Sequence, residues 1–240
     1  MRSRIFCALD TPHLDQAMTW ARQVKGAVDG IKLGLEFFTA QGAAGVLKLM
    51  TFAGPQTQLF LDLKFHDIPN TVYGAVSSVM PLRPAFLTVH ASGGVEMMRA
   101  AKQAAYDASL ELGYPTPKIL AVTVLTHMDQ GDLNDVGQGL EIENQVKRLA
   151  ELAEKADLDG IVCSPHEVSM LRQYCHDDFK LMVPGIRPEG AVQSDQKRVM
   201  TPVEAMQQGA DYLVIGRPIT KSDDPQEAAQ NIVNMLEQAA

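Results

Sequence analysis

The sequence has few cysteines, no long apolar run and no surplus of basic residues. Three cysteines among 240 residues fit reduced core thiols better than a disulfide framework. The apolar stretches are far shorter than the ~20 residues of a membrane span. The N-terminus reaches Asp10 without the long apolar region of a signal peptide. We therefore expect a cytoplasmic protein with no membrane partner.

The charge balance is acidic, with 21 Lys and Arg against 29 Asp and Glu and a formal net charge of −8. Because nucleic-acid-binding proteins normally carry a basic patch or arm, this balance disfavours a nucleic-acid partner. It does not exclude a small anionic ligand, since a few basic side chains in a cleft set the local potential. The His, Cys and acidic residues show no metal-ligand spacing, so we expect no catalytic metal.

Short apolar, β-branched segments alternate with helical patterns along the whole chain. Near-continuous apolar runs are typical of strands buried on both faces of a parallel sheet. The expected strands are residues 5–10, 30–35, 58–65, 86–91, 119–126, 160–164, 181–184 and 212–216. Eight strand–helix units without a linker predict an α/β protein, a (β/α)₈ TIM barrel, as one domain over residues 1–240. The alternative is a doubly wound open sheet, which usually has fewer strands and a Gly-rich first loop.

Two further features concern the loops. Residues 164–167, 201–204 and 224–227 each combine a capping side chain, a proline and a glutamate, a typical helix start. Residues 185–201 are polar and lack helical periodicity, which is typical of a lid or binding loop. The alternative for this segment is a disordered surface excursion.

A row of charged residues occupies the predicted third strand. Asp62 and Lys64 are two positions apart and point to the same face of that strand. Lys32 lies in the second strand, and Asp67 follows just beyond the third. Because buried charges need partners, we expect an alternating cation–anion chain at the C-terminal mouth of the barrel, where these enzymes place reactive groups. The alternative is a purely structural ion-pair network.

The loops after the last two strands each contain glycine and arginine. Gly185 and Arg187 follow the seventh strand, and Gly216 and Arg217 follow the eighth. Phosphate sites of TIM barrels are commonly built from these two loops. Glycine admits close backbone approach, and arginine offers a bidentate fork for phosphate oxygens. The sequence therefore predicts a phosphorylated small molecule whose other end meets Asp62 and Lys64.

The segment Asp62-Leu63-Lys64-Phe65-His66-Asp67-Ile68-Pro69-Asn70-Thr71 resembles the signature of the orotidine 5′-phosphate decarboxylase family, bacterial type. The likeness extends over the whole chain, through segments 8–10, 31–34, 122–126, 183–188 and 215–218. It implies conversion of orotidine 5′-phosphate to UMP and carbon dioxide, the last step of de novo pyrimidine nucleotide biosynthesis. It also implies that no cofactor or metal is used and that the protein is a homodimer.

The resemblance further implies residue roles. Lys64 would protonate C6, Asp62 would sit beside the substrate carboxylate, and Lys32 would hold Asp62 and touch the ribose. Asp67, Ile68 and Thr71 would reach into the partner's site. The other substrate-binding positions would be Asp10 at the ribose, Thr126 near the pyrimidine, Pro184, and Arg187, Gln196, Gly216 and Arg217 at the phosphate.

One position departs from the family pattern: His127 stands where a small hydroxyl residue is common. Two other functions stay open. One is a related phosphate-binding barrel, a sugar-phosphate decarboxylase or aldolase. Such an enzyme would need extra carboxylates for magnesium, or a Schiff base at Lys64. The other is a non-catalytic sensor of a phosphorylated ligand.

Overall fold

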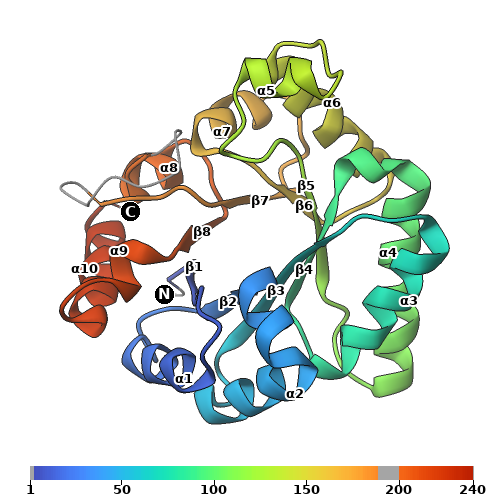
Figure 1. The fold of residues 1–240 in the computed structure, drawn as a ribbon. Coiled ribbons are helices and arrows are strands. Elements are labelled where there is room, and N and C mark those ends of the chain that lie inside the picture. The colour runs from blue at the N-terminus through green and yellow to red at the C-terminus, as the bar shows by residue number, and fades with distance from the viewer. Residues whose placement is uncertain (1–2, 189–199, 240) are drawn as a thin grey trace.

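Eight parallel strands close into a barrel in a computed structural model of the chain, which describes residues 3–188 and 200–239 (Figure 1). Each strand pairs with the next, and β8 pairs back with β1. This closure confirms the predicted (β/α)₈ TIM barrel. The strands are β1 (Ile5–Ala8), β2 (Gly30–Gly34), β3 (Gln58–Phe65), β4 (Phe86–His90), β5 (Lys118–Val122), β6 (Gly160–Val162), β7 (Lys180–Val183) and β8 (Tyr212–Ile215).

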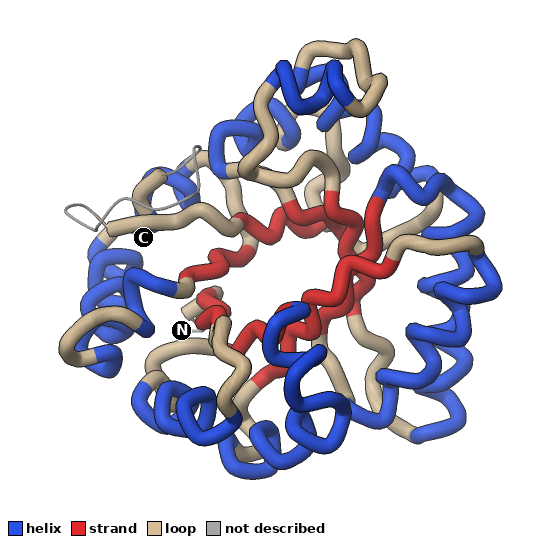
Figure 2. Tube along the Cα trace, in the orientation of Figure 1, coloured by secondary structure: helices blue, strands red, loops and turns tan. Residues whose placement is uncertain are grey.

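Helices surround the barrel on its outer side, as Figure 2 shows. Among the described residues, none of them is long and apolar enough to cross a membrane. The α-helices are α1 (Leu14–Gln23), α2 (Leu35–Ala53), α3 (Pro69–Val79), α4 (Gly94–Leu112), α5 (Gln130–Asp135), α6 (Ile142–Lys155), α7 (Val168–Leu171), α8 (Pro202–Gln207), α9 (Arg217–Thr220) and α10 (Pro225–Gln238). Short 3₁₀ turns are η1 (Met80–Leu82), η2 (Ala91–Gly93) and η3 (Pro165–Glu167).

Two apolar layers hold the barrel together. The outer layer joins strands to helices and includes Leu61 and Leu63 of β3, as strand alternation predicts. The inner layer fills the barrel, where Phe6, Phe60 and Phe86 meet edge to face with ring centroids 5.3 to 6.0 Å apart. Such contacts suit the ring quadrupoles. This aromatic cluster fills the inside of the barrel, and its member Phe60 also lines the cavity at the C-terminal mouth.

Several predicted strands extend past the observed ones. The ladder of β1 ends at Ala8 and that of β5 at Val122, so Asp10 and Thr126 lie in the loops that follow. The apolar run continues because these loops are themselves packed, and Val124 is buried. Hydrophobicity reports burial, and it does not show where backbone pairing stops.

The predicted helix starts are confirmed. Thr201 forms a capping box with Glu204, the Glu167 carboxylate accepts the backbone N–H of Ser164 at 2.8 Å, and the Asp224 carboxylate accepts two backbone N–H groups of α10. These contacts satisfy donors that a helix leaves without internal partners. In the long loop after β7, Ile186 pairs with Met200 in an isolated bridge. Most of the predicted lid, including Gln196, lies outside the described residues.

Candidate active site

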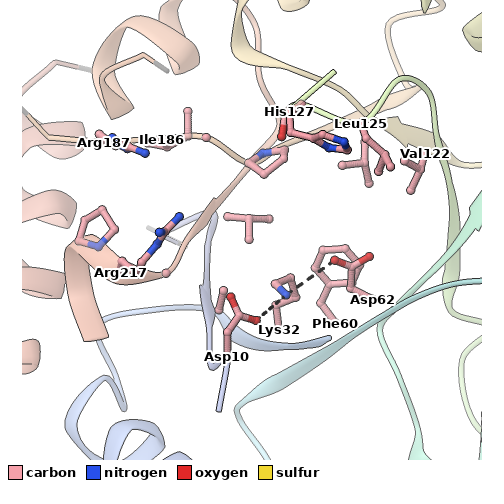
Figure 3. A pocket seen from close by; sticks show the side chains of 18 of the residues that line it. Asp10, Lys32, Phe60, Asp62, Val122, Leu125, His127, Ile186, Arg187 and Arg217 are labelled. Atoms are coloured by element: carbon pink, nitrogen blue, oxygen red, sulfur yellow. Dashed lines mark hydrogen bonds and ion pairs between the residues drawn. The ribbon is translucent and has the colours of Figure 1, made fainter. Parts of the chain in front are cut away.

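Four charged side chains of alternating sign meet at the C-terminal ends of the first three strands. Lys32 Nζ lies 3.1 Å from Asp10 Oδ1 and 3.7 Å from Asp62 Oδ2. Lys64 Nζ lies 2.8 Å from Asp62 Oδ2. Figure 3 shows the run from Asp10 through Lys32 to Asp62 along one wall of a pocket. We call Asp10, Lys32, Asp62 and Lys64 the ion row, and most of the predicted cation–anion chain is thereby formed.

The ion row keeps its inner members charged although they are buried. Burial alone would raise the pKa of Asp62, but the ammonium groups of Lys32 and Lys64, with hydrogen bonds, hold it below its usual value. Burial alone would lower the pKa of Lys32, but Asp62 and Asp10 raise it above its usual value. Each of these charges therefore stabilises the ionised form of its neighbour. Lys32 and Asp62 thus stay charged at neutral pH.

The backbone at Lys64 adopts a left-handed conformation that residues with a Cβ rarely take, with a φ of +51°. The register between β3 and β4 shifts at this point: Leu61 pairs with Leu87, whereas Phe65 pairs with Val89. The third strand therefore carries extra residues in a β-bulge, a feature that re-aims side chains. Lys64 lines the same cavity as Asp62.

The ion row forms one part of a cavity of about 710 Å³ at the mouth of the barrel. Its size is typical of a small-molecule site. Apolar side chains, among them Phe60, Val122 and Val214, line the surface between the charged groups. The cavity therefore combines an apolar surface with a few convergent polar groups, which suits a compact molecule with charged ends.

Arg187 and Arg217 line another part of the same cavity, the arginine end (Figure 3). Gly185 has a φ of +78°, which glycine adopts readily. A Cβ at Gly216 would lie 3.3 Å from the Cβ of Ala8, so a larger residue would crowd this turn. The predicted Gly–Arg loops therefore converge at one place, where guanidinium groups and a close backbone suit a phosphate.

Other predicted residues fall into three groups. Thr126, Pro184 and His127 line the cavity. Asp67, Ile68 and Thr71 are exposed and do not line it. Gln196 lies outside the described residues. The expectation that Asp67 extends the charged chain within one protomer is wrong, because its Oδ1 accepts the N–H of Ile68 at 2.6 Å, and within the described residues Asp67 forms no ion pair.

Three polar residues at or near the site belong to no motif found in the sequence and were not predicted. Lys221 and Ser222 line the cavity beside Arg217, and Lys221 follows the single turn of α9. Thr88 of β4 is fully buried and contacts the ion row. A hydroxyl inside an otherwise apolar strand, in the sequence Phe86-Leu87-Thr88-Val89-His90, is a signal that was available in the sequence.

Two histidines lie next to the ion row. The rings of His66 and His90 have centroids 5.3 Å apart. Burial, together with the nearby His66 and Lys64, lowers the pKa of His90 to about 4, so its imidazole is neutral at pH 7. In residues 3–188 and 200–239, no three His, Cys, Asp or Glu side chains form a group that could hold a metal ion.

Comparison with known proteins gives a consistent result. The model of the "Orotidine 5'-phosphate decarboxylase / HUMPS family" matches residues 3–232. An orotidine 5′-phosphate decarboxylase from Rhodospirillum rubrum is 54% identical over 232 residues, 97% of this chain and 93% of that protein. One from Gluconobacter oxydans is 48% identical over 242 residues, 99% of each chain. The crystal structure of the Lactobacillus acidophilus orotidine 5′-phosphate decarboxylase is 35% identical, with a TM-score of 0.84 over 97% of this chain and 98% of that one.

Proposed function

Because the chain belongs to the orotidine 5′-phosphate decarboxylase / HUMPS family, we propose that it converts orotidine 5′-phosphate to UMP and carbon dioxide. The relatives that match over nearly their full length carry the decarboxylase name, which favours this reaction within the family. The protein would act in the cytoplasm at the last step of de novo pyrimidine nucleotide biosynthesis.

The observation that carries the proposal is the distribution of charge in one cavity. Orotidine 5′-phosphate is anionic at both its phosphate and its carboxylate. The arginine end offers Arg187 and Arg217, and the ion row offers Lys32 and Lys64. Apolar surface lies between them and suits a pyrimidine. An acidic protein can thus bind a multiply charged anion, because cation placement, rather than net charge, sets the local potential.

The proposed chemistry uses groups of the ion row. The bond between C6 and the carboxylate carbon breaks, carbon dioxide leaves, and the electron pair stays on C6. The Lys64 ammonium then donates a proton to C6, and the resulting amine regains a proton from solvent. Its hydrogen bond to Asp62, 2.8 Å long, holds the ammonium in place beforehand. Preorganised charge of this kind needs no rearrangement as charge develops, so it stabilises the transition state strongly.

The other members of the row position the substrate. Asp62 would lie beside the departing carboxylate and raise the energy of the bound substrate by repulsion. Lys32 would hold Asp62 and touch the ribose, and Asp10 would bind a ribose hydroxyl. Thr126 and Pro184 would lie near the pyrimidine. The phosphate would be bound by Arg187, Gly216 and Arg217, and by Gln196 from the loop that follows β7.

We propose that the protein is a homodimer in which Asp67, Ile68 and Thr71 complete the partner's site. Residues 66–71 are all exposed at the end of β3, and Ile68 is 66% exposed although it is apolar. A segment that runs from the end of β3 into the first turn of α3 and exposes an isoleucine beside acidic and hydroxyl side chains suits an interface that also contacts a substrate.

A subunit-mixing experiment tests the shared site. Lys64→Ala and Asp67→Ala proteins would each be inactive alone. In a mixed dimer, one site would keep both native residues, so an equal mixture should regain about a quarter of the wild-type activity. Two Lys64→Ala preparations mixed together are the control. An inactive mixture that contains proven heterodimers would place Asp67 and Lys64 in the same chain's site.

The activity itself is tested by following the ultraviolet absorbance of orotidine 5′-phosphate with the purified protein, with and without a chelator. We expect turnover to UMP that the chelator leaves unchanged, because the proposed steps use only Lys64 and its neighbours and need no metal or cofactor. Loss of activity on chelation would favour a metal-dependent sugar-phosphate enzyme. Borohydride trapping of a substrate adduct would favour a Schiff base, and binding without turnover would favour a sensor.

A further inference from the structure

Thr88 lies in the middle of β4, and its side chain is fully buried. Strands buried on both faces of a parallel barrel are normally built from Val, Ile and Leu. A buried hydroxyl costs free energy unless it forms hydrogen bonds. The presence of threonine therefore requires a partner inside the barrel wall, and the structure supplies two.

Both partners belong to the catalytic segment of β3. The Thr88 hydroxyl donates to Asp62 Oδ1 at 2.9 Å, and it accepts the backbone N–H of Lys64 at 2.9 Å. The Lys64 ammonium contacts the other carboxylate oxygen, Oδ2, at 2.8 Å. Asp62 is thus held from both sides. One hydroxyl links the carboxylate to the backbone of the lysine that the carboxylate orients, and a hydroxyl can do this because it both donates and accepts.

The second contact replaces a missing backbone partner. Between Leu61 and Phe65 the β3 chain advances four residues, while the paired β4 residues Leu87 and Val89 are only two apart. In this bulge the N–H of Lys64 bonds the Thr88 side chain instead of a carbonyl of the ladder. Lys64 also has the left-handed φ of +51°, which is unfavourable for a residue with a Cβ and persists only where the surroundings enforce it.

We propose that Thr88 is a positioning residue for the decarboxylation: its hydroxyl fixes the Asp62 carboxylate and the left-handed backbone of Lys64 together, so that the ammonium is aimed at the reacting carbon. This inference rests on the proposed function, because it takes Lys64 as the proton donor. Thr88 itself does not line the cavity, so it acts on the reaction only through Asp62 and Lys64.

A purely structural role for Thr88 makes different predictions from a positioning role. If the hydroxyl only provided hydrogen bonds to buried polar groups of the barrel wall, its loss would lower the stability of the fold. The turnover of the folded enzyme would then be unchanged. If it aims Lys64, its loss lowers kcat while KM and UMP affinity change little, because the arginine end is untouched. The serine variant retains the hydroxyl and should retain the rate.

The test measures kcat, KM, UMP affinity and melting temperature for Thr88→Val, which keeps the shape and removes the hydroxyl. We expect kcat to fall about 10- to 100-fold, as for loss of a hydrogen bond to a charged group. We expect KM and UMP affinity to stay within about threefold. Thr88→Ser should lie within about threefold of the wild-type kcat. Should Thr88→Val fail to fold, the Thr88→Ala and Thr88→Ser pair, which differs by one oxygen atom, gives the same comparison.

Thr123→Val is the matched control. Thr123 is another buried threonine near the barrel mouth, and its hydroxyl donates to the backbone oxygen of Val162 at 3.2 Å without touching the ion row. It should keep the wild-type kcat. The inference is overturned if Thr88→Val keeps the wild-type kcat, or if Thr88→Ser or Thr123→Val loses as much activity.

The same assay separates the two proposals. Active wild type and inactive Lys64→Ala, together with a fully active Thr88→Val, would overturn the role of Thr88 and leave the proposed function standing. A wild-type protein without turnover of orotidine 5′-phosphate would overturn the proposed function, and the role of Thr88 with it.

Discussion

The ion row and the arginine end of the cavity are built in different ways. In the ion row, Lys32 and Asp62 are part of strands that have a neighbouring strand on each side. Lys64 is held in the bulge of β3 through Thr88, and only Asp10 lies in a loop. Arg187 and Arg217 follow the ends of their strands, in or next to turns. Lys32 and Asp62 are 9% and 8% exposed, whereas Arg217 belongs to the exposed surface.

This difference matches the role proposed for each end. Stabilising a charge that develops at one carbon requires donors that are fixed before the reaction, and strands supply them. Binding a phosphate requires charge and N–H groups that a substrate can reach from solvent, and loops supply them. We therefore expect changes in the ion row to act on kcat and on stability, and changes at the arginine end to act on KM.

The arginine pair should give the largest change in substrate binding. Replacing both Arg187 and Arg217 by alanine removes two guanidinium groups from the proposed phosphate site. We expect KM for orotidine 5′-phosphate to rise about 10²- to 10⁴-fold, from the usual strength of charge-assisted hydrogen bonds. The matched control is Arg22→Ala, on the exposed side of α1, which should leave KM unchanged. A large fall in kcat at unchanged KM would contradict the division between the two ends.

The ion row should give a smaller, pH-dependent effect on stability. The pKa of Asp62 is lowered from its ordinary value of 3.8 by Lys32 and Lys64, against the effect of burial. Its stabilising contribution is therefore complete well above pH 4 and is lost as the pH falls through the lower folded-state pKa. Urea unfolding of wild type should show a free energy of unfolding that drops more between pH 5 and 3 than in Asp62→Asn. Parallel curves for the two proteins would show that the row contributes no such linkage.

His127 should give the smallest effect. Its ring lines the cavity from the loop after β5 and is exposed, so water can take its place when the ring is removed. His127→Ser restores the small hydroxyl side chain common in the family. We expect kcat/KM to change by no more than about threefold, because contacts at an exposed rim are energetically near neutral. A much larger gain or loss would show that His127 contacts the substrate directly.

The barrel architecture could be predicted from the sequence because each buried strand has a recognisable apolar, β-branched pattern. Residues 86–91 and 212–216 are apolar and β-branched because both of their faces are buried. The strand ends were less predictable. Asp10 and Thr126 lie beyond the ladder, since packed loops at the mouth of the barrel prolong the apolar pattern of β1 and β5.

The site was predicted in outline for a similar reason. Alternation correctly placed Asp62 and Lys64 in one cavity, although a bulge separates them from the regular ladder. That bulge and the role of Thr88 depend on the register between β3 and β4, which no local pattern encodes. The expected place of Asp67 in the charged chain was wrong, because strand alternation does not show that the chain turns outward after β3 and leaves Asp67 exposed.

Lys64→Ala separates the proposed chemistry at Lys64 from substrate binding at the arginine end. Turnover of orotidine 5′-phosphate and the Kd of UMP should be measured on the same folded protein. We expect kcat to fall about 10⁴-fold, because both the proton donor and its fixed charge are removed. UMP affinity should stay within about tenfold of wild type, because Arg187 and Arg217 are intact. A kcat within about tenfold of the wild-type value would show that Lys64 is not the proton donor.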